Sequence, residues 1–250
     1  MKEQRPDLFI SEGVDAFMSS LLKVFKEDEI RMVALYGSAA KGTFICGFSD
    51  IQLFVVLNGP LDAQLVKLSS YTARAIQQYR ILPMLMSEAE LNESTDIYTM
   101  EYIELKHTAR IIHGEDLFEA LVIDRDLYRH QIEMRMRGSI MTLRQMLLQI
   151  EGRRRPLTEF LNQWCDSQDS LFRALIIIKD EKHTEDILEE SFTGIVDIIS
   201  DLYGISSSEL AVVYTFSDSQ DLRLIDQDTV LSLLKIYEAL TGALENMGRK

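Results

Sequence analysis

Cysteine, proline and tryptophan are scarce in this sequence. Its 250 residues include two cysteines, four prolines, four histidines and a single tryptophan. Cys46 and Cys165 lie far apart, and neither has a cysteine or histidine at the spacing of a zinc motif. We therefore expect neither a disulfide framework nor a structural zinc site, because each needs several such side chains at short, regular spacings.

Long hydrophobic runs are also missing. No uninterrupted apolar stretch approaches the roughly 18 residues that cross a bilayer. Residues 1–13, MKEQRPDLFISEG, lack the apolar segment of a secretion signal. The sequence thus predicts a cytoplasmic protein with no membrane partner. Because 46% of its residues are hydrophobic, the chain can bury one large core or two modest ones.

Positive charge is in short supply as well. Lysine and arginine number 26 against 40 aspartates and glutamates, which gives a net charge of −14. We therefore expect no nucleic-acid partner, because binding a polyanion requires basic side chains that neutralise its phosphates. The exception is the segment 125–155, which holds eight arginines and three acidic residues.

The most informative stretch covers residues 33–57, VALYGSAAKGTFICGFSDIQLFVVL. One apolar run ends at Gly37 and Ser38, and Ser49 and Asp50 open a second. This pattern predicts strand, turn, short helix, loop and strand. Such a turn can bring backbone N–H groups against a phosphate, since glycine allows close approach and helix N-termini favour anions. A carboxylate beside it is placed to hold a divalent cation.

The stretch resembles the signature of the nucleotidyltransferase superfamily, which includes DNA polymerase beta and the aminoglycoside nucleotidyltransferases. The resemblance rests on the segments Gly37-Ser38-Ala39-Ala40-Lys41-Gly42 and Ser49-Asp50-Ile51-Gln52-Leu53. It implies that a nucleotide's phosphates bind at Gly37, Ser38, Lys41 and Ser49. It also implies that Asp50 is catalytic and ligates Mg²⁺.

The resemblance breaks at the second metal ligand, where the family has another aspartate and this chain has Gln52. A glutamine amide can ligate a hard cation but brings no charge, and two-metal chemistry depends on charge neutralisation. The family's third carboxylate belongs on the strand predicted at 80–86, which contains no acid. Ser87 and Glu90 just after it fit a capping box instead. We therefore expect only weak Mg²⁺ binding at Asp50.

The order of predicted elements indicates an α+β protein. A nucleotidyltransferase-like mixed sheet with helices is expected over residues 1–123, followed by an all-α helical bundle over residues 124–250. The first part alternates between a helix at 14–25, strands near 31–36, 50–57 and 80–86, and a helix at 61–78. The second shows helical periodicity almost throughout, over 126–151, 157–180, 184–203, 206–214 and 228–246. Gly204 is expected to cap the helix that ends at Tyr203. This layout is similar to that of the kanamycin-type nucleotidyltransferases.

The arginine-rich helix at the start of the second part has two interpretations. Arg129, Glu133 and Arg137 follow one another at intervals of four, which predicts an exposed ion-pair ladder. Alternatively, one or more of its arginines face a nucleotide phosphate at an interdomain cleft: Arg129, Arg135, Arg137 and Arg144. Three further arginines are expected at the helix end, where cations favour the negative pole of the macrodipole: Arg153, Arg154 and Arg155.

Three functions fit these features. The first is a nucleotidyltransferase-like protein that is catalytically reduced and binds a nucleotide, or no small molecule, in a regulatory role. The second is an active nucleotidyltransferase that moves a nucleoside monophosphate to a small-molecule hydroxyl. The third is an antitoxin-like partner of a separate toxin. An acidic bundle with a basic stripe also suggests a homodimer, and a monomer mass by light scattering at micromolar concentration would contradict it.

Overall fold

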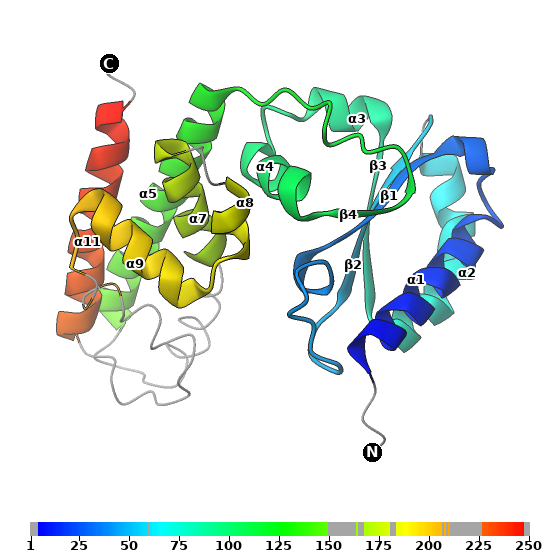
Figure 1. Ribbon diagram of the computed structural model, residues 1–250, viewed down its shortest axis with the longest axis horizontal. Helices are drawn as coiled ribbons and strands as arrows, with labels where there is room; N and C mark the ends of the chain where they lie inside the picture. The colour runs from blue at the N-terminus through cyan, green and yellow to red at the C-terminus, as the bar shows by residue number, and fades with distance from the viewer. Residues whose placement is uncertain are drawn as a thin grey trace. The chain divides into compact units, whose positions relative to one another are not determined.

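The computed structural model describes residues 5–59, 61–149, 164, 168–180, 184–206, 208, 210 and 227–247. The chain divides into two compact units, Met1–Ile123 and Asp124–Lys250, which are shown in Figure 1 and described separately. That each unit is an independent domain stays a prediction. Some predictions fall outside the described residues: Arg153 to Arg155, the first part of the helix expected over 157–180, and most of that over 206–214.

The first unit is a mixed sheet with helices on both faces, as the sequence predicts. The strand order is β3-β2-β1-β4, with β2 and β3 parallel and β1 antiparallel to both β2 and β4. The elements are α1 (Pro6–Leu21), β1 (Ile30–Tyr36), β2 (Ile51–Leu57), α2 (Asp62–Tyr79), β3 (Ile81–Ser87), α3 (Glu88–Glu93), α4 (Thr99–Thr108) and β4 (Arg110–Gly114).

The two central strands are buried on both faces, which explains why they read as continuous apolar runs. Alternate residues of β1 and β2 point to opposite faces. One set, which includes Val33 and Leu53, packs under α1 and α2. The other, which includes Ala34 and Phe54, packs under α3, α4 and the segment after β4. Figure 1 shows the two pairs of helices on either side of the sheet.

The first helix begins earlier than predicted. The sequence indicated a helix over 14–25, whereas α1 spans Pro6–Leu21 and is followed by turns. Pro6 occupies the first helical turn, where its missing N–H costs nothing and its fixed φ favours the helix. Phe9 and Ile10 extend the buried face of the helix toward its N-terminus.

The described residues of the second unit that have regular structure are helical. They form α5 (Arg125–Gln149), α7 (Gln168–Lys179), α8 (Thr184–Glu189), α9 (Phe192–Tyr203) and α11 (Gln227–Met247). Gly204 follows α9 in the left-handed conformation, φ 67°, and caps it as the sequence predicts. Within the described parts of both units, no helix combines the length and apolar character that crossing a bilayer requires.

The predicted ion pairs on α5 form, but Arg129 and Glu133 are half-buried, and Arg137 is the exposed member of the three. Glu133 lies 3.5 Å from Arg129 Nη1 and 2.8 Å from Arg137 Nε. Two arginines of α5 also pair with carboxylates of α11, Arg137 with Glu245 and Arg144 with Glu238. Three of the four arginines considered for phosphate binding are thus engaged in ion pairs within the second unit.

A buried glutamine links three helices in the core of this unit. Gln168 Oε1 accepts hydrogen bonds from Tyr237 of α11 at 2.8 Å and from Ser139 of α5 at 3.3 Å. Gln168 Nε2 donates to the Trp164 carbonyl at 2.7 Å. All four side chains are buried, so this network fixes how α5, α7 and α11 pack, because an unpaired buried amide is costly.

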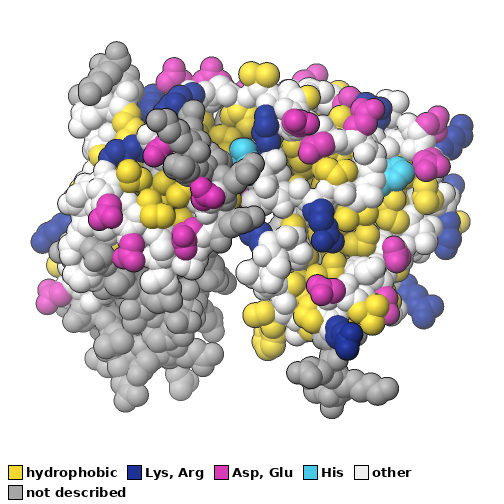
Figure 2. Space-filling model, viewed as in Figure 1, with side chains coloured by type: hydrophobic (Ala, Val, Ile, Leu, Met, Phe, Trp, Pro, Cys, Tyr) yellow, Lys and Arg dark blue, Asp and Glu magenta, His cyan; other side chains and the backbone are white. Residues whose placement is uncertain are grey.

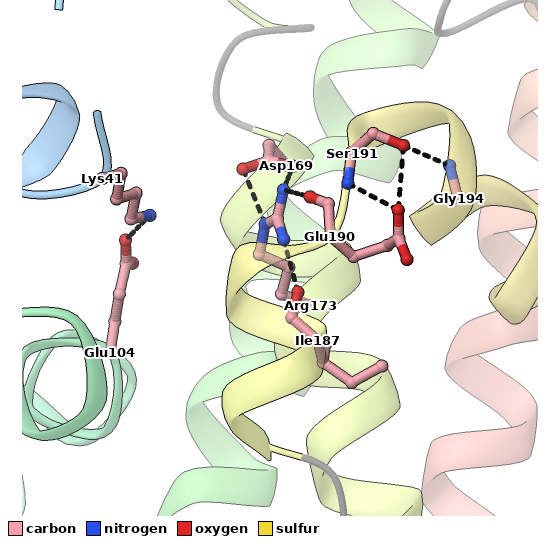
Figure 3. Close-up of polar contacts among 8 residues, drawn as sticks. All are labelled: Lys41, Glu104, Asp169, Arg173, Ile187, Glu190, Ser191 and Gly194. Carbon is pink, nitrogen blue, oxygen red and sulfur yellow. Dashed lines mark hydrogen bonds and ion pairs between the residues drawn. The ribbon is translucent and has the colours of Figure 1, made fainter. Parts of the chain in front are cut away.

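A buried arginine of α7 contacts the end of α8 and the residues just before α9 (Figure 3). The Arg173 side chain is 8% exposed and forms two contacts of 2.8–2.9 Å with Asp169. It also donates to the carbonyl oxygens of Ile187 and Glu190. Those carbonyls lie at the end of α8, where backbone oxygens lack helical partners. Ser191 then caps α9 by accepting from Gly194 N–H at 3.1 Å.

Candidate functional site

The Gly37–Ala39 turn between β1 and β2 is closed by its own hydrogen bonds. Gly37 has φ 66°, a conformation that favours glycine. Its carbonyl oxygen accepts from the N–H groups of Ala40 and Lys41 at 3.1 and 3.0 Å. The Ser38 carbonyl accepts from Thr43 N–H at 3.0 Å. The turn predicted from the sequence is therefore a single 3₁₀ turn.

Ser49 closes the loop that follows. Its hydroxyl accepts from Ile45 N–H at 3.0 Å, and its own N–H donates to the Ile45 carbonyl at 2.9 Å. Ser49 thus stabilises the loop just before β2 begins. Its predicted role in phosphate binding stays a prediction.

The Gln52 side chain lies directly over Gly37. Gln52 pairs with Tyr36 across β1 and β2, which brings its amide next to the turn. A Cβ atom at position 37 would overlap Gln52 Oε1 and lie 2.9 Å from Gln52 Cδ. Glycine is favoured at position 37 by its φ value, whereas the contact with Gln52 involves the end of a flexible side chain that can shift. The Gln52 amide thus lies where a side chain at position 37 would stand.

A cavity of about 590 Å³ opens beside this turn. Gly37 and Gln52 line it, whereas Ser38, Ser49 and Asp50 are not among its described lining residues. Its walls come from the sheet and from α4, and they include Tyr36, Phe54, Tyr98, Glu101, Tyr102 and Glu104. A volume of this size is typical of a small-molecule site.

The walls of this cavity are aromatic on both sides. Tyr36 and Phe54 of the sheet meet edge to face, with ring centroids 6.4 Å apart. Tyr98 and Tyr102, at the start of α4, meet edge to face at 5.9 Å. Burial raises the pKa of Tyr36 and Tyr102 above the usual value for a phenol. Both hydroxyls therefore stay protonated at neutral pH.

Two acidic residues of α4 line the cavity, and sequence reasoning missed both. Glu101 and Glu104 are three residues apart, so they share a helix face. Lys41 Nζ lies 2.6 Å from Glu104 Oε1 (Figure 3). The lysine expected to bind phosphate is thus already paired with a carboxylate. The spacing of Glu101 and Glu104 was the only feature of the sequence that could have indicated these residues. It did not place them near the Gly37 turn, because the approach of α4 to the turn depends on tertiary packing.

Asp50, just before β2, is paired as well, with Arg80 just before β3. Its Oδ1 lies 2.9 Å from Arg80 Nη2, and the two side chains are 44% and 47% exposed. Arg80 has φ 53°, the sole non-glycine residue with positive φ in the described part of the chain. It also donates to the Phe48 carbonyl at 3.2 Å. An ion pair this exposed contributes only about 0–1 kcal/mol.

The acids that follow β3 are engaged elsewhere. Glu88 Oε2 lies 2.9 Å from Arg31 Nε. Glu90 accepts from Ser87 N–H at 2.7 Å while its own N–H donates to the Ser87 hydroxyl at 3.1 Å. This confirms the predicted capping box. The hydrogen bonds from Ser87 lower the pKa of Glu90.

The residues at this site do not fit a two-metal centre. Mg²⁺ needs near-octahedral oxygen ligands and is usually held by carboxylates. Beside Asp50, the second ligand position carries the neutral Gln52, whose partner on β3 is the apolar Leu82. Among the described residues, no group of three or more His, Cys, Asp and Glu could hold a metal ion. Within residues 37–52, Asp50 is therefore the single carboxylate, and it already has a cationic neighbour in Arg80.

Comparison with known protein families identifies the fold. Residues 18–115 match the family model described as the nucleotidyltransferase domain. The match begins within α1 and extends past β4, so it contains the whole sheet, the Gly37 turn and the cavity. This part of the chain is thus similar to the nucleotidyltransferase domain, and its mixed sheet flanked by helices agrees with that fold. No curated protein matches the chain.

Proposed function

We propose that this nucleotidyltransferase domain is catalytically reduced and serves as a ligand-binding, regulatory module. The observation that carries the proposal is the position of Gln52. Its amide stands where the family has a metal-binding aspartate, and it covers Gly37, where a phosphate would approach. One substitution thus removes a negative charge from the metal site and fills part of the phosphate site.

The other charged groups of the motif support this proposal. Lys41 is paired with Glu104, and Asp50 is paired with Arg80. A triphosphate would have to displace Glu104 from Lys41 before it gained a cation. A metal ion would compete with Arg80 for Asp50. Each step costs part of the binding free energy, and neither is offset by a second carboxylate at position 52.

The Gln52→Asp variant tests this assignment. Restoring a charged ligand should tighten Mg²⁺-dependent nucleotide binding by about 1.5–3 kcal/mol, the contribution of a hydrogen bond or ligand contact to an ionised group. Calorimetric titration with each of the four common nucleoside triphosphates, with and without Mg²⁺, measures the change. The unmodified protein should show little or no dependence on Mg²⁺.

Two controls make the result specific. Gln145→Asp makes the same chemical change at an exposed position of α5 and should leave nucleotide binding unaltered. Adding Asp50→Asn to Gln52→Asp should abolish the gain, because it removes the first ligand. Tight Mg²⁺-dependent binding by the unmodified protein that is lost in Asp50→Asn would contradict the proposal.

A further inference from the structure

The cavity beside Gly37 is chemically unlike a polyphosphate site. Its described lining contains two carboxylates, Glu101 and Glu104, and no lysine or arginine. Lys41 lies outside that lining and balances the charge of Glu104 through their ion pair, so Glu101 supplies the net local negative charge. A triphosphate carries several negative charges, and the whole chain has a net charge of −14. Both the local and the long-range field therefore oppose an anion and favour a cation.

The aromatic walls add a second, independent preference for positive charge. Tyr36 stands on the sheet side and Tyr98 on the α4 side, and both keep part of their surface exposed, whereas Phe54 and Tyr102 pack against them and are fully buried. Aromatic faces carry partial negative charge, so rings on two sides of one space favour an ammonium group. Burial raises the pKa of the Tyr36 and Tyr102 phenols, so these two add no charge of their own at physiological pH.

The protein itself shows how an ammonium group is held here. Lys41 presents an alkylammonium to Glu104 at 2.6 Å, at the edge of the same cavity (Figure 3). Glu101 lies one helical turn away on the same face of α4, next to Tyr98 and Tyr102 in the chain. The cavity thus combines a second carboxylate with aromatic rings in a volume of about 590 Å³.

We propose that this cavity binds a small organic cation, an amine attached to an aromatic or aliphatic body, in place of a nucleotide. The ammonium group lies toward Glu101, and the apolar body packs between the sheet-side and helix-side aromatic rings. This inference rests on the proposed function, because a nucleotide and Mg²⁺ bound in the cavity would leave no room for the amine. It names the class of ligand that the reduced domain senses.

Three probes of one shape and different charge test the proposal. These are 2-phenylethylamine, 2-phenylethanol and 3-phenylpropionate, titrated into the full chain and followed by calorimetry or by NMR chemical shifts. The amine should bind about tenfold more tightly than the alcohol, as expected for a desolvated cation near aromatic rings and a carboxylate. The carboxylate should bind most weakly. Equal affinity for amine and alcohol, or a preference for the carboxylate, would overturn the proposal.

Variants locate the site. Glu101→Gln should weaken amine binding about fivefold to tenfold and leave binding of the alcohol unchanged, because it removes only the charge. Glu93→Gln, at an exposed position of α3 outside the cavity lining, should have no effect. Equal losses in the two variants would place the amine elsewhere on the acidic surface and overturn the proposal. The probe comparison in the unmodified chain is decisive even if Glu101→Gln fails to fold.

Titration with ATP separates failure of this inference from failure of the proposed function. Mg²⁺-dependent ATP binding that displaces the amine and is lost in Asp50→Asn would overturn both. Absence of Mg²⁺-dependent ATP binding together with no discrimination among the three probes would overturn this inference alone. Amine preference without Mg²⁺-dependent ATP binding is the expected result.

Discussion

Replacing Arg173 with leucine is expected to destabilise the second unit by about 1–3 kcal/mol, the usual cost of leaving a buried hydrogen-bond acceptor without its donor. The side chain is 8% exposed and satisfies Asp169 and the carbonyl oxygens of Ile187 and Glu190. Leucine fills part of the volume but donates no hydrogen bond. The buried oxygens would be left without this donor, which is costlier than the loss of a surface contact.

The single tryptophan makes this measurement specific. Trp164 is buried in the second unit, so its fluorescence during urea unfolding reports on that unit. Arg137→Leu is the matched control, because Arg137 also forms ion pairs but is 56% exposed. It should cost about 0–1 kcal/mol. If Arg173→Leu changed the free energy of unfolding no more than Arg137→Leu does, Arg173 would not hold α7, α8 and α9 together.

Replacing Gly114 with alanine is expected to destabilise the first unit by about 2–5 kcal/mol, from left-handed backbone strain and overpacking. Gly114 has φ 82° and ends β4 where it pairs with β1. A Cβ there would overlap the Arg31 carbonyl oxygen and lie 2.7 Å from its carbon. Because the obstacle is backbone, only a shift of β1 or β4 could relieve it.

Gly47 offers a closely matched control for this substitution. Its φ is 85°, and a Cβ added there meets nothing within 4 Å. Gly47→Ala should therefore show only the backbone strain, about 1–2 kcal/mol. The difference between the two variants, measured by urea unfolding with circular dichroism, isolates the steric conflict at Gly114. Equal losses of unfolding free energy in the two variants would mean that β1 and β4 move apart at Gly114 at little energetic cost.

Local sequence patterns predicted much of the structure. The capping box of Ser87 and Glu90 and the cap at Gly204 each depend on a few adjacent residues, and the structure confirms both. The alternation of strands and helices also predicted the mixed sheet, because apolar runs between turn residues indicate buried strands. The start of α1 was missed, although Pro6 is a recognised signal for the first turn of a helix.

The site was only partly predictable, because its chemistry depends on contacts between distant segments. The motif indicated Gly37, Asp50 and the substitution at Gln52. It could not show that Gln52 covers Gly37, since that requires the pairing of β1 with β2. Nor could it place Glu104 beside Lys41, which lies 63 residues away. Arg80 read as the start of a strand, and its left-handed backbone and contact with Asp50 had no local signal.

The central claim is that the Gly37 to Gln52 region does not assemble a metal centre around a nucleotide. It is tested most directly by titrating Mn²⁺, a paramagnetic substitute for Mg²⁺, into isotopically labelled protein with ATP present. Line broadening of backbone amides then reports where the ion binds. The exposed acidic turn Glu27–Glu29 serves as an internal reference for weak surface binding. We predict that the amides of Gly37, Asp50 and Gln52 broaden no more than those of this turn. Selective broadening of those three amides at lower Mn²⁺ concentration, lost in Asp50→Asn, would contradict the claim.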